Sequence, residues 1–370
     1  MKILLCFGTR PEAIKMASLV QKLKSSPSIE VKVCVTAQHR QMLDQVLEFF
    51  EIVPDYDLDI MKENQTLNEL CGRIFMKIDH VLEDSNPDIV LVHGDTTTSS
   101  VCAWAAFHRG IKVGHVEAGL RTFDKFSPFP EELNRQISTR ICDYHFAPTS
   151  QSRQNLLNEK ITPEKILVTG NTVIDSLLWA AKKIDAGYSN SKITELKSVL
   201  NFNKRIILVT GHRRENFGDG FLNICKALAK LAKNNDVEIV YPVHLNPQVQ
   251  KPVLELLSGI SNIHLIEPLD YPSFIWMMQK SYFIITDSGG VQEEAPSLGK
   301  PVLVMRETTE RPEAVTEGTV ILVGTDENKI MAEAENLLNN KADYEKMARA
   351  HNPYGDGKAA SRIVDFFEKK

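Results

Sequence analysis

The sequence has no paired cysteines, no long apolar run at its start and no excess of basic residues. Because none of its six cysteines stands in a C-x-x-C pair, we interpret them as buried thiols in a reducing compartment. The apolar run at residues 3–7 is too short for a signal peptide or a membrane span. The net charge of −5 gives no electrostatic reason to bind nucleic acid or an anionic membrane. These absences predict a cytoplasmic protein with no membrane and no nucleic acid as partner.

Sequence motifs for common cofactors and metals are also missing. The sequence contains neither G-x-G-x-x-G nor a Walker A motif, so neither a redox dinucleotide site nor an ATP site is supported. His93, His115, His212 and His244 do not fall at zinc-ligand spacings, and we therefore expect no metal site.

Short apolar runs alternate with helical patterns along the whole chain. Most of these runs lack polar alternation, which is typical of strands buried on both faces of a parallel sheet. We predict strands at 2–7, 31–36, 88–93, 111–116, 143–147, 166–169, 205–210, 237–243, 262–266, 282–286, 301–304 and 319–323. We expect helices between them, including 11–26, 66–84, 217–234 and 326–340.

Six strands followed by six more predict an α/β fold with two doubly wound, Rossmann-like domains facing a central cleft. We place the N-terminal domain at 1–169 and the C-terminal domain at 170–353. The last helix, within 354–370, should pack back on the first domain. At 370 residues the chain is long enough for two such cores. Ligands of such folds bind at the carboxyl ends of the strands.

The most informative turn of the second half follows the strand expected at 282–286. There Asp287-Ser288-Gly289-Gly290 leads directly into a helical segment, where free N–H groups and the small glycines would suit a phosphate. Glu294, one helical turn further, could accept hydrogen bonds from a sugar diol. His212, in a His–Arg–Arg cluster at another strand end, also suits a diphosphate. An ordinary β–α turn would explain the glycines equally well.

Charged side chains follow the predicted strands of the first half. Arg10 and Lys15 follow the first strand and could face a diphosphate, although a solvated helix start would look the same. Asp95 stands where Asp most often caps a helix. Glu117 lies between small residues at the end of a buried strand, where a carboxylate is costly unless it is paired or working. Glu131 opens a helix and is favoured there by the helix dipole alone.

The ordered set of motifs resembles the non-hydrolysing UDP-N-acetylglucosamine 2-epimerases along essentially the whole chain. The shared segments are 7–13, 92–96, 114–122, 211–216, 286–295 and 309–313. The resemblance implies a GT-B-like fold, a homodimer and no cofactor. It also implies that the chain binds UDP-GlcNAc, UDP-ManNAc and UDP and interconverts the two sugars. The product would supply ManNAc units for cell-surface polysaccharide or glycoconjugate synthesis.

The resemblance also implies roles for individual residues. The residues matching catalytic positions are Asp95, Glu117, Glu131 and His212. Those matching substrate-binding positions are Arg10, Lys15, Phe274, Ser288, Gly289, Gly290, Glu294 and Arg311. Those matching a second, activating UDP-GlcNAc site are Gln38, Gln41, Arg213 and His244. Asn64 stands where a relative has arginine, which weakens the case for activation.

The expected chemistry explains why several carboxylates are needed. The C2 hydrogen of a closed sugar ring is not acidic, so its loss must be coupled to departure of UDP from C1. Returning the proton to the other face requires more than one acid–base group. A retaining glycosyltransferase, a hydrolysing epimerase and a non-catalytic sugar-nucleotide sensor remain alternatives.

Overall fold

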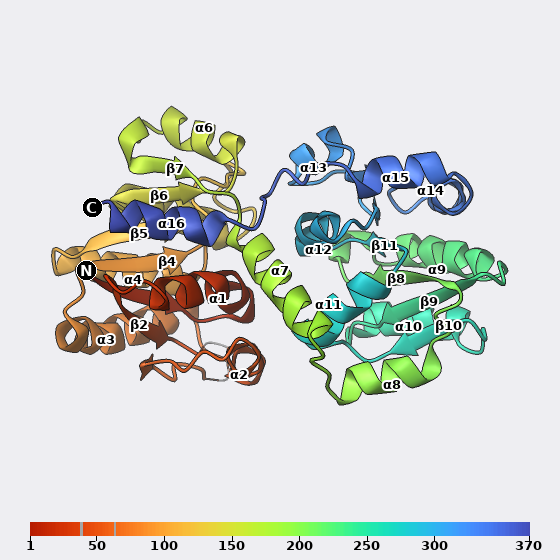
Figure 1. The fold of residues 1–370 in the computed structure, drawn as a ribbon, viewed down its shortest axis with the longest axis horizontal. Helices are drawn as coiled ribbons and strands as arrows, with labels where there is room; N and C mark the ends of the chain where they lie inside the picture. Colours follow the sequence, from red (N-terminus) through yellow and green to blue (C-terminus); the bar gives the residue numbers. More distant parts are fainter. Residues whose placement is uncertain (38–39, 63) are drawn as a thin grey trace. The chain divides into compact units, whose positions relative to one another are not determined.

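The computed structural model describes residues 1–37, 40–62 and 64–370 (Figure 1). The strands are β1 (Lys2–Phe7), β2 (Glu30–Val35), β3 (Tyr56–Asp57), β4 (Ile89–His93), β5 (Lys112–Val116), β6 (Tyr144–Ala147), β7 (Ile166–Val168), β8 (Arg205–Thr210), β9 (Val237–Pro242), β10 (Ile263–Ile266), β11 (Phe283–Thr286), β12 (Val302–Val304) and β13 (Val320–Leu322).

Helices connect these strands in regular succession. The α-helices of the first half are α1 (Arg10–Lys24), α2 (Arg40–Phe49), α3 (Leu67–Ser85), α4 (Thr97–His108), α5 (Glu131–Ile141), α6 (Ser150–Asn158), α7 (Thr172–Asp185) and α8 (Ser191–Val199). Those of the second half are α9 (Asp219–Leu231), α10 (Pro247–Leu257), α11 (Tyr271–Lys280), α12 (Gly289–Glu294), α13 (Pro312–Thr316), α14 (Glu327–Asn339), α15 (Lys341–Ala348) and α16 (Ala359–Glu368). Short 3₁₀ turns are η1 (Pro163–Lys165), η2 (Arg214–Asn216) and η3 (Ala295–Leu298).

The chain divides into two compact units. Unit 1 comprises residues 1–179 and 354–370, and unit 2 comprises residues 180–353. The first change of unit falls after Trp179, inside α7, about ten residues beyond the boundary expected from the sequence. The second falls between Pro353 and Tyr354.

Unit 1 is built on one parallel sheet with the strand order β3-β2-β1-β4-β5-β6-β7. The chain moves along the sheet in opposite directions from β1 and from β4. Right-handed crossovers therefore place α1 and α2 on one face and α3, α4 and α5 on the other. α16 packs beside α1, as Figure 1 also shows. It is fastened by the Asp175 carboxylate, which accepts the N–H groups of Ala359 and Ala360 at 3.1 and 3.0 Å.

Unit 2 repeats this plan with the parallel order β10-β9-β8-β11-β12-β13. Its core gathers apolar side chains from β8, β9 and β11 with those of α9, α10 and α14. In both sheets the order reverses at a central pair, β1 with β4 and β8 with β11. Loops at the carboxyl ends of such a pair are the usual ligand sites of doubly wound sheets.

The predicted α/β class with two doubly wound sheets is confirmed. All twelve predicted strands are present, and their ends agree within one residue. The two-residue strand β3 was not predicted. Among the described helices, none is both long and apolar enough to cross a membrane.

Candidate active site

The carboxyl edge of the unit 1 sheet gathers most of the acidic and basic residues expected at the site. Because the strands are parallel, the loops after β1, β4, β5 and β7 emerge at the same edge. Arg10 opens α1 after β1, and Thr9 caps that helix. The carboxylate of Glu12 accepts hydrogen bonds from the N–H groups of Gly8 and Thr9 at 3.0 and 2.8 Å. The first loop is therefore rigidly tied to its own helix.

Two hydrogen bonds join α1 and the end of β2 to the start of α4. The Thr96 hydroxyl donates to Glu12 Oε1 at 2.6 Å, and Thr36 and Thr98 share a hydrogen bond of 2.8 Å. Burial raises the pKa of Glu12, and the hydrogen bonds from its neighbours oppose that rise only in part. A Cβ on Gly8 would lie 1.9 Å from Thr36 Oγ1. Only glycine fits there without displacing this threonine pair.

Glu117 is the most heavily contacted of the predicted acid–base residues. Its backbone has φ +63°, and its side chain is 8% exposed. Oε2 is ion-paired with Lys15 Nζ and accepts a hydrogen bond from Asn171 Nδ2 at 2.9 Å. His93 Nε2 lies 3.9 Å from the same oxygen. The strained conformation directs a carboxylate to a cluster drawn from the ends of four neighbouring elements.

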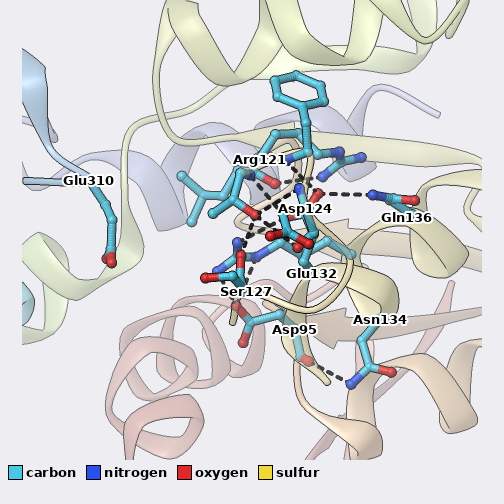
Figure 2. Close-up of polar contacts among 12 residues, drawn as sticks. Asp95, Arg121, Asp124, Ser127, Glu132, Asn134, Gln136 and Glu310 are labelled. Atoms are coloured by element: carbon cyan, nitrogen blue, oxygen red, sulfur yellow. Dashed lines mark hydrogen bonds and ion pairs between the residues drawn. The ribbon is translucent and has the colours of Figure 1, made fainter. Parts of the chain in front are cut away.

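Asp95 does not cap the following helix, which was one expectation for it. Thr96 is the N-cap of α4, and its hydroxyl accepts the N–H of Ser99 at 3.1 Å. Arg135 donates to Asp95 Oδ2 from both Nε and Nη2, at 2.9 and 2.7 Å. Asn134 Nδ2 donates to the backbone oxygen of Asp95 at 2.9 Å, and Figure 2 shows Asn134 beside Asp95.

Asp95 and Glu117 both act on the buried His115. Its Nε2 lies 2.7 Å from the carbonyl oxygen of Gly94. Burial lowers the pKa of His115 to about 4, while the two carboxylates oppose that change. His115 is therefore neutral at pH 7. Because it is fully buried, it holds the Gly94 carbonyl between β4 and Asp95 and is not exposed to a ligand.

Glu131 occupies the first position of α5, after Pro130. Its side chain makes no hydrogen bond or ion pair among the residues that the structure describes. Its neighbour Glu132 is fully buried and bonds the backbone of the 122–123 segment. The two adjacent glutamates thus have different surroundings. Glu132 is buried and holds the backbone, whereas Glu131 is half-buried and makes no such contact within the described residues.

In unit 2 the first cluster forms where β8 and β11 end side by side. The buried carboxylate of Asp287 accepts the N–H groups of His212 and Arg213, both at 2.8 Å. His212 Nδ1 lies 3.3 Å from Asp287 Oδ1. Burial alone would raise the pKa of Asp287, but His212 and the backbone donors outweigh it and lower the pKa. The Asp287 carboxylate therefore holds the backbone of His212 and lies close to one nitrogen of its exposed ring.

The glycine turn predicted as a phosphate site leads into α12. Ser288 is the N-cap residue, and Gly290 is exposed. A Cβ on Gly289 would lie 2.5 Å from Arg311 Nη1, so glycine lets the guanidinium cover the turn closely. Arg311 Nε in turn donates to Glu293 at 2.6 Å. The turn therefore combines the start of a helix with a fixed cation.

The remaining predicted residues are placed as follows. Glu294 is buried at the end of α12, and Phe274 lies half-buried in the first turn of α11. The ring of His244 stacks on that of His212, with centroids 5.5 Å apart. Arg213, which follows His212 in the sequence, is half-buried.

The activating role expected from the resemblance stays a prediction. Gln38 lies outside the described residues, and for Gln41 only its place in α2 is described. Asn64 is exposed.

Sequence reasoning missed the partners that hold these residues. They are Asn171 and His93 at Glu117, Arg135 and Asn134 at Asp95, Asp287 at His212, and Glu293 at Arg311. A weak signal existed for two of them, because Asp287 directly follows one predicted strand and Asn171 lies two residues after the end of another. The others could be found only from the fold.

Comparisons with known proteins match nearly the whole chain to one family. A family model described as UDP-N-acetylglucosamine 2-epimerase matches residues 21–368. A UDP-N-acetylglucosamine 2-epimerase of Salmonella typhimurium is 58% identical over 366 residues, which cover 98% of this chain and 97% of that relative.

Solved structures show the same relationship. The UDP-GlcNAc 2-epimerase of Neisseria meningitidis, solved bound to UDP-GlcNAc, is 51% identical with a TM-score of 0.90 over the whole of both chains. The enzyme of Methanocaldococcus jannaschii, solved with UDP-GlcNAc and UDP, is 35% identical with a TM-score of 0.80 over the whole of both chains.

A more distant likeness concerns the fold alone. The Acinetobacter baumannii protein MurG is 15% identical with a TM-score of 0.59, again over the whole of both chains. It agrees with the GT-B-like fold class expected from the sequence. The matching family model and the close full-length relatives together show that this chain belongs to the UDP-N-acetylglucosamine 2-epimerase family.

Proposed function

We propose that this chain inverts C2 of UDP-GlcNAc to give UDP-ManNAc, reversibly and without a cofactor, by eliminating and re-adding UDP. The observation that carries the proposal is the setting of Glu117. Its backbone is in the left-handed region, and its carboxylate contacts Lys15 and Asn171. It lies at the same sheet edge as Asp95. Two fixed carboxylates at one edge are what proton transfer on two faces of a sugar requires.

The reaction divides into two balanced steps. A carboxylate removes the C2 proton while the C1–O bond breaks, so that UDP leaves with the bonding electrons and a C1=C2 double bond forms. UDP then adds back to C1 of this 2-acetamidoglucal, and a proton is delivered to the opposite face of C2. Asp95, Glu117 and Glu131 are the groups that we assign to these proton transfers.

Leaving UDP carries negative charge, which must be stabilised in the transition state. We assign this task to Arg10, His212 and Arg311 and to the backbone at the start of α12. Asp287 supports the assignment for His212, because its carboxylate lies 3.3 Å from Nδ1 and leaves Nε2 for a phosphate oxygen. Glu294 would accept the ribose hydroxyls. The relatives solved with UDP-GlcNAc and with UDP support these ligands.

Incubating the protein with UDP-GlcNAc in D₂O tests the function and separates the alternatives. Deuterium at C2 together with UDP-ManNAc is the expected result. Free ManNAc with UDP would mean that the protein is a hydrolysing epimerase. Absence of both exchange and product would leave a glycosyltransferase or a sensor.

The carboxylate assignments have their own test in the same assay. Asp95→Asn, Glu117→Gln and Glu131→Gln should each lower turnover by ~10²-fold or more. UDP binding, measured by calorimetry, should change much less because other residues hold the nucleotide. Near-normal turnover in a folded Glu117→Gln protein would remove Glu117 from the mechanism.

A further inference from the structure

The hydrogen bonds to Asp95 distinguish its two carboxylate oxygens. Arg135 directs two donors, Nε and Nη2, to the same atom, Oδ2, at 2.9 and 2.7 Å. Within the described residues Oδ1 has no protein donor. A carboxylate usually receives the arginine fork on both oxygens, and here the fork holds only one. One oxygen is fixed, and the other stays available to exchange a proton.

The helix that supplies Arg135 also fixes the backbone of Asp95. Asn134 donates to the Asp95 carbonyl at 2.9 Å and itself accepts a hydrogen bond of 3.1 Å from Ser100. Adjacent residues of α5 thus hold the main chain and the side chain of Asp95. This double attachment sets the position of the Asp95 carboxylate, which is 26% exposed.

Arg135 is anchored in turn by Glu132, one helical turn earlier. Its Nη1 lies 3.2 Å from Glu132 Oε2, and the Glu132 side chain is fully buried. The Glu132 carboxylate also accepts the N–H groups of Thr122 and Phe123 at 3.0 and 3.2 Å. Gln136 adds a further donor at 3.0 Å, and Figure 2 shows Glu132 at the centre of these contacts.

The charge state of this anchor is fixed as well. Burial alone would raise the pKa of Glu132, but hydrogen bonds from Gln136, Thr122 and Arg135 outweigh it and lower the pKa. Glu132 therefore favours its ionised form, in which it pairs with the Arg135 guanidinium. The three charges form a chain from a buried carboxylate through Arg135 to the half-exposed carboxylate of Asp95.

We infer that Arg135 is a positioning residue for the epimerisation: anchored on Glu132, it holds Oδ2 of Asp95 and leaves Oδ1 to transfer the C2 proton. The inference rests on the proposed function, since it refines how Asp95 acts. Arg135 itself is not assigned a contact with the substrate.

Arg135→Lys and Arg135→Gln test this role. The lysine keeps the charge but cannot direct two nitrogens to one oxygen, so it should lower kcat about 10-fold, whereas the glutamine should lower it ~10²-fold. KM should stay within about threefold of the wild type, because the nucleotide contacts are elsewhere. Arg140→Gln, on the same helix but bound to the Glu159 carbonyl, is the matched control and should retain full turnover.

Two measurements separate positioning from simple support of the fold. With substrates deuterated at C2, the isotope effect on kcat should increase in the Arg135 variants for at least one of the two epimers, because misplacing Asp95 slows the proton transfer itself. Adding Arg135→Gln to Asp95→Asn should slow the enzyme no further than Asp95→Asn alone, since both changes act through one carboxylate.

The outcomes separate this inference from the proposed function. If the wild type fails to incorporate deuterium at C2, the proposed function itself is wrong. If the wild type incorporates it, an unchanged isotope effect or multiplying losses in the double variant would show that Arg135 does not act through Asp95.

Discussion

At the carboxyl edge of the unit 1 sheet, Glu117 has a strained backbone that is held by side-chain contacts. A non-glycine residue at φ +63° costs on the order of 1–2 kcal/mol, and the contacts to Lys15 and Asn171 hold it there. The sequence predicted that a carboxylate at this strand end would be either paired with another group or part of the functional site. It could not predict the partners, which are 102 and 54 residues away.

Asp95 illustrates the opposite limit of sequence reasoning. Local preference makes Asp a common helix cap, yet the next residue, Thr96, takes that place. Asp95 is held instead by Arg135, 40 residues later. A local pattern can name the residue types at a helix start, but it cannot decide which of two neighbours faces a distant cation.

The buried Glu294 gives a prediction at the scale of one side chain. If it accepts the ribose hydroxyls, Glu294→Ala should lose about 1.5–3 kcal/mol of UDP binding free energy, the usual value for charge-assisted hydrogen bonds. Isothermal titration calorimetry with UDP measures the loss directly. Glu335→Ala, an exposed change on α14, is the control and should bind UDP normally. Unchanged affinity in Glu294→Ala would leave this glutamate without a role in binding UDP.

The helices and strands were far more predictable than the contacts between side chains. Strands buried on both faces leave continuous apolar runs, and such runs located β4 and β8 closely. The two-residue β3 escaped because it lies at the sheet edge and is too short to show a pattern. The unit boundary also escaped, because it falls within α7 and has no turn or change of composition to mark it.

Two glycines in different elements should respond to alanine with opposite signs. Gly8, in the turn between β1 and α1, has Thr36 and Thr98 oxygens 1.9 and 2.7 Å from any added Cβ. Gly8→Ala should therefore destabilise the protein by about 1–3 kcal/mol. Gly72, inside α3, has open space around that position, and Gly72→Ala should stabilise by about 0.5–1 kcal/mol.

Thermal unfolding followed by calorimetry compares the two variants with the wild type under one condition. The midpoint temperature of the first unfolding transition should be lower for Gly8→Ala and higher for Gly72→Ala than for the wild type. An unshifted transition in Gly8→Ala would mean that the threonine pair can move aside at little cost.

Two buried histidines with lowered pKa values both lie in unit 1. Burial lowers the pKa of His115 to about 4 and that of His145 to about 3. Both belong to adjacent strands of unit 1, β5 and β6. The unfolded chain takes up a proton on each histidine as the pH falls below about 6.5, whereas the folded chain stays neutral until much lower pH. Their effect is thus absent above pH 6.5 and favours unfolding as the pH falls from there.

Acid should consequently destabilise unit 1 by up to about 1.4 kcal/mol per pH unit for each histidine between pH 6.5 and 4. Urea unfolding at several pH values measures this slope, and hydrogen exchange of β5 and β6 peptides, corrected for intrinsic rates, locates it in unit 1. His145→Leu should flatten the slope. An equal slope in that variant would assign the acid sensitivity to other groups.

The packing of α16 on α1 makes unit 1 discontinuous in the chain, and this has a consequence for synthesis on the ribosome. The helix that completes the first unit is made only after all of the second, about 170 residues later, which at the usual rates of translation is a delay of roughly ten seconds or more. Until then, the surface that Ile363, Val364 and Phe367 will bury stays uncovered. The nascent chain therefore passes through a stage in which its N-terminal unit is folded except for one apolar face, the kind of surface that chaperones recognise.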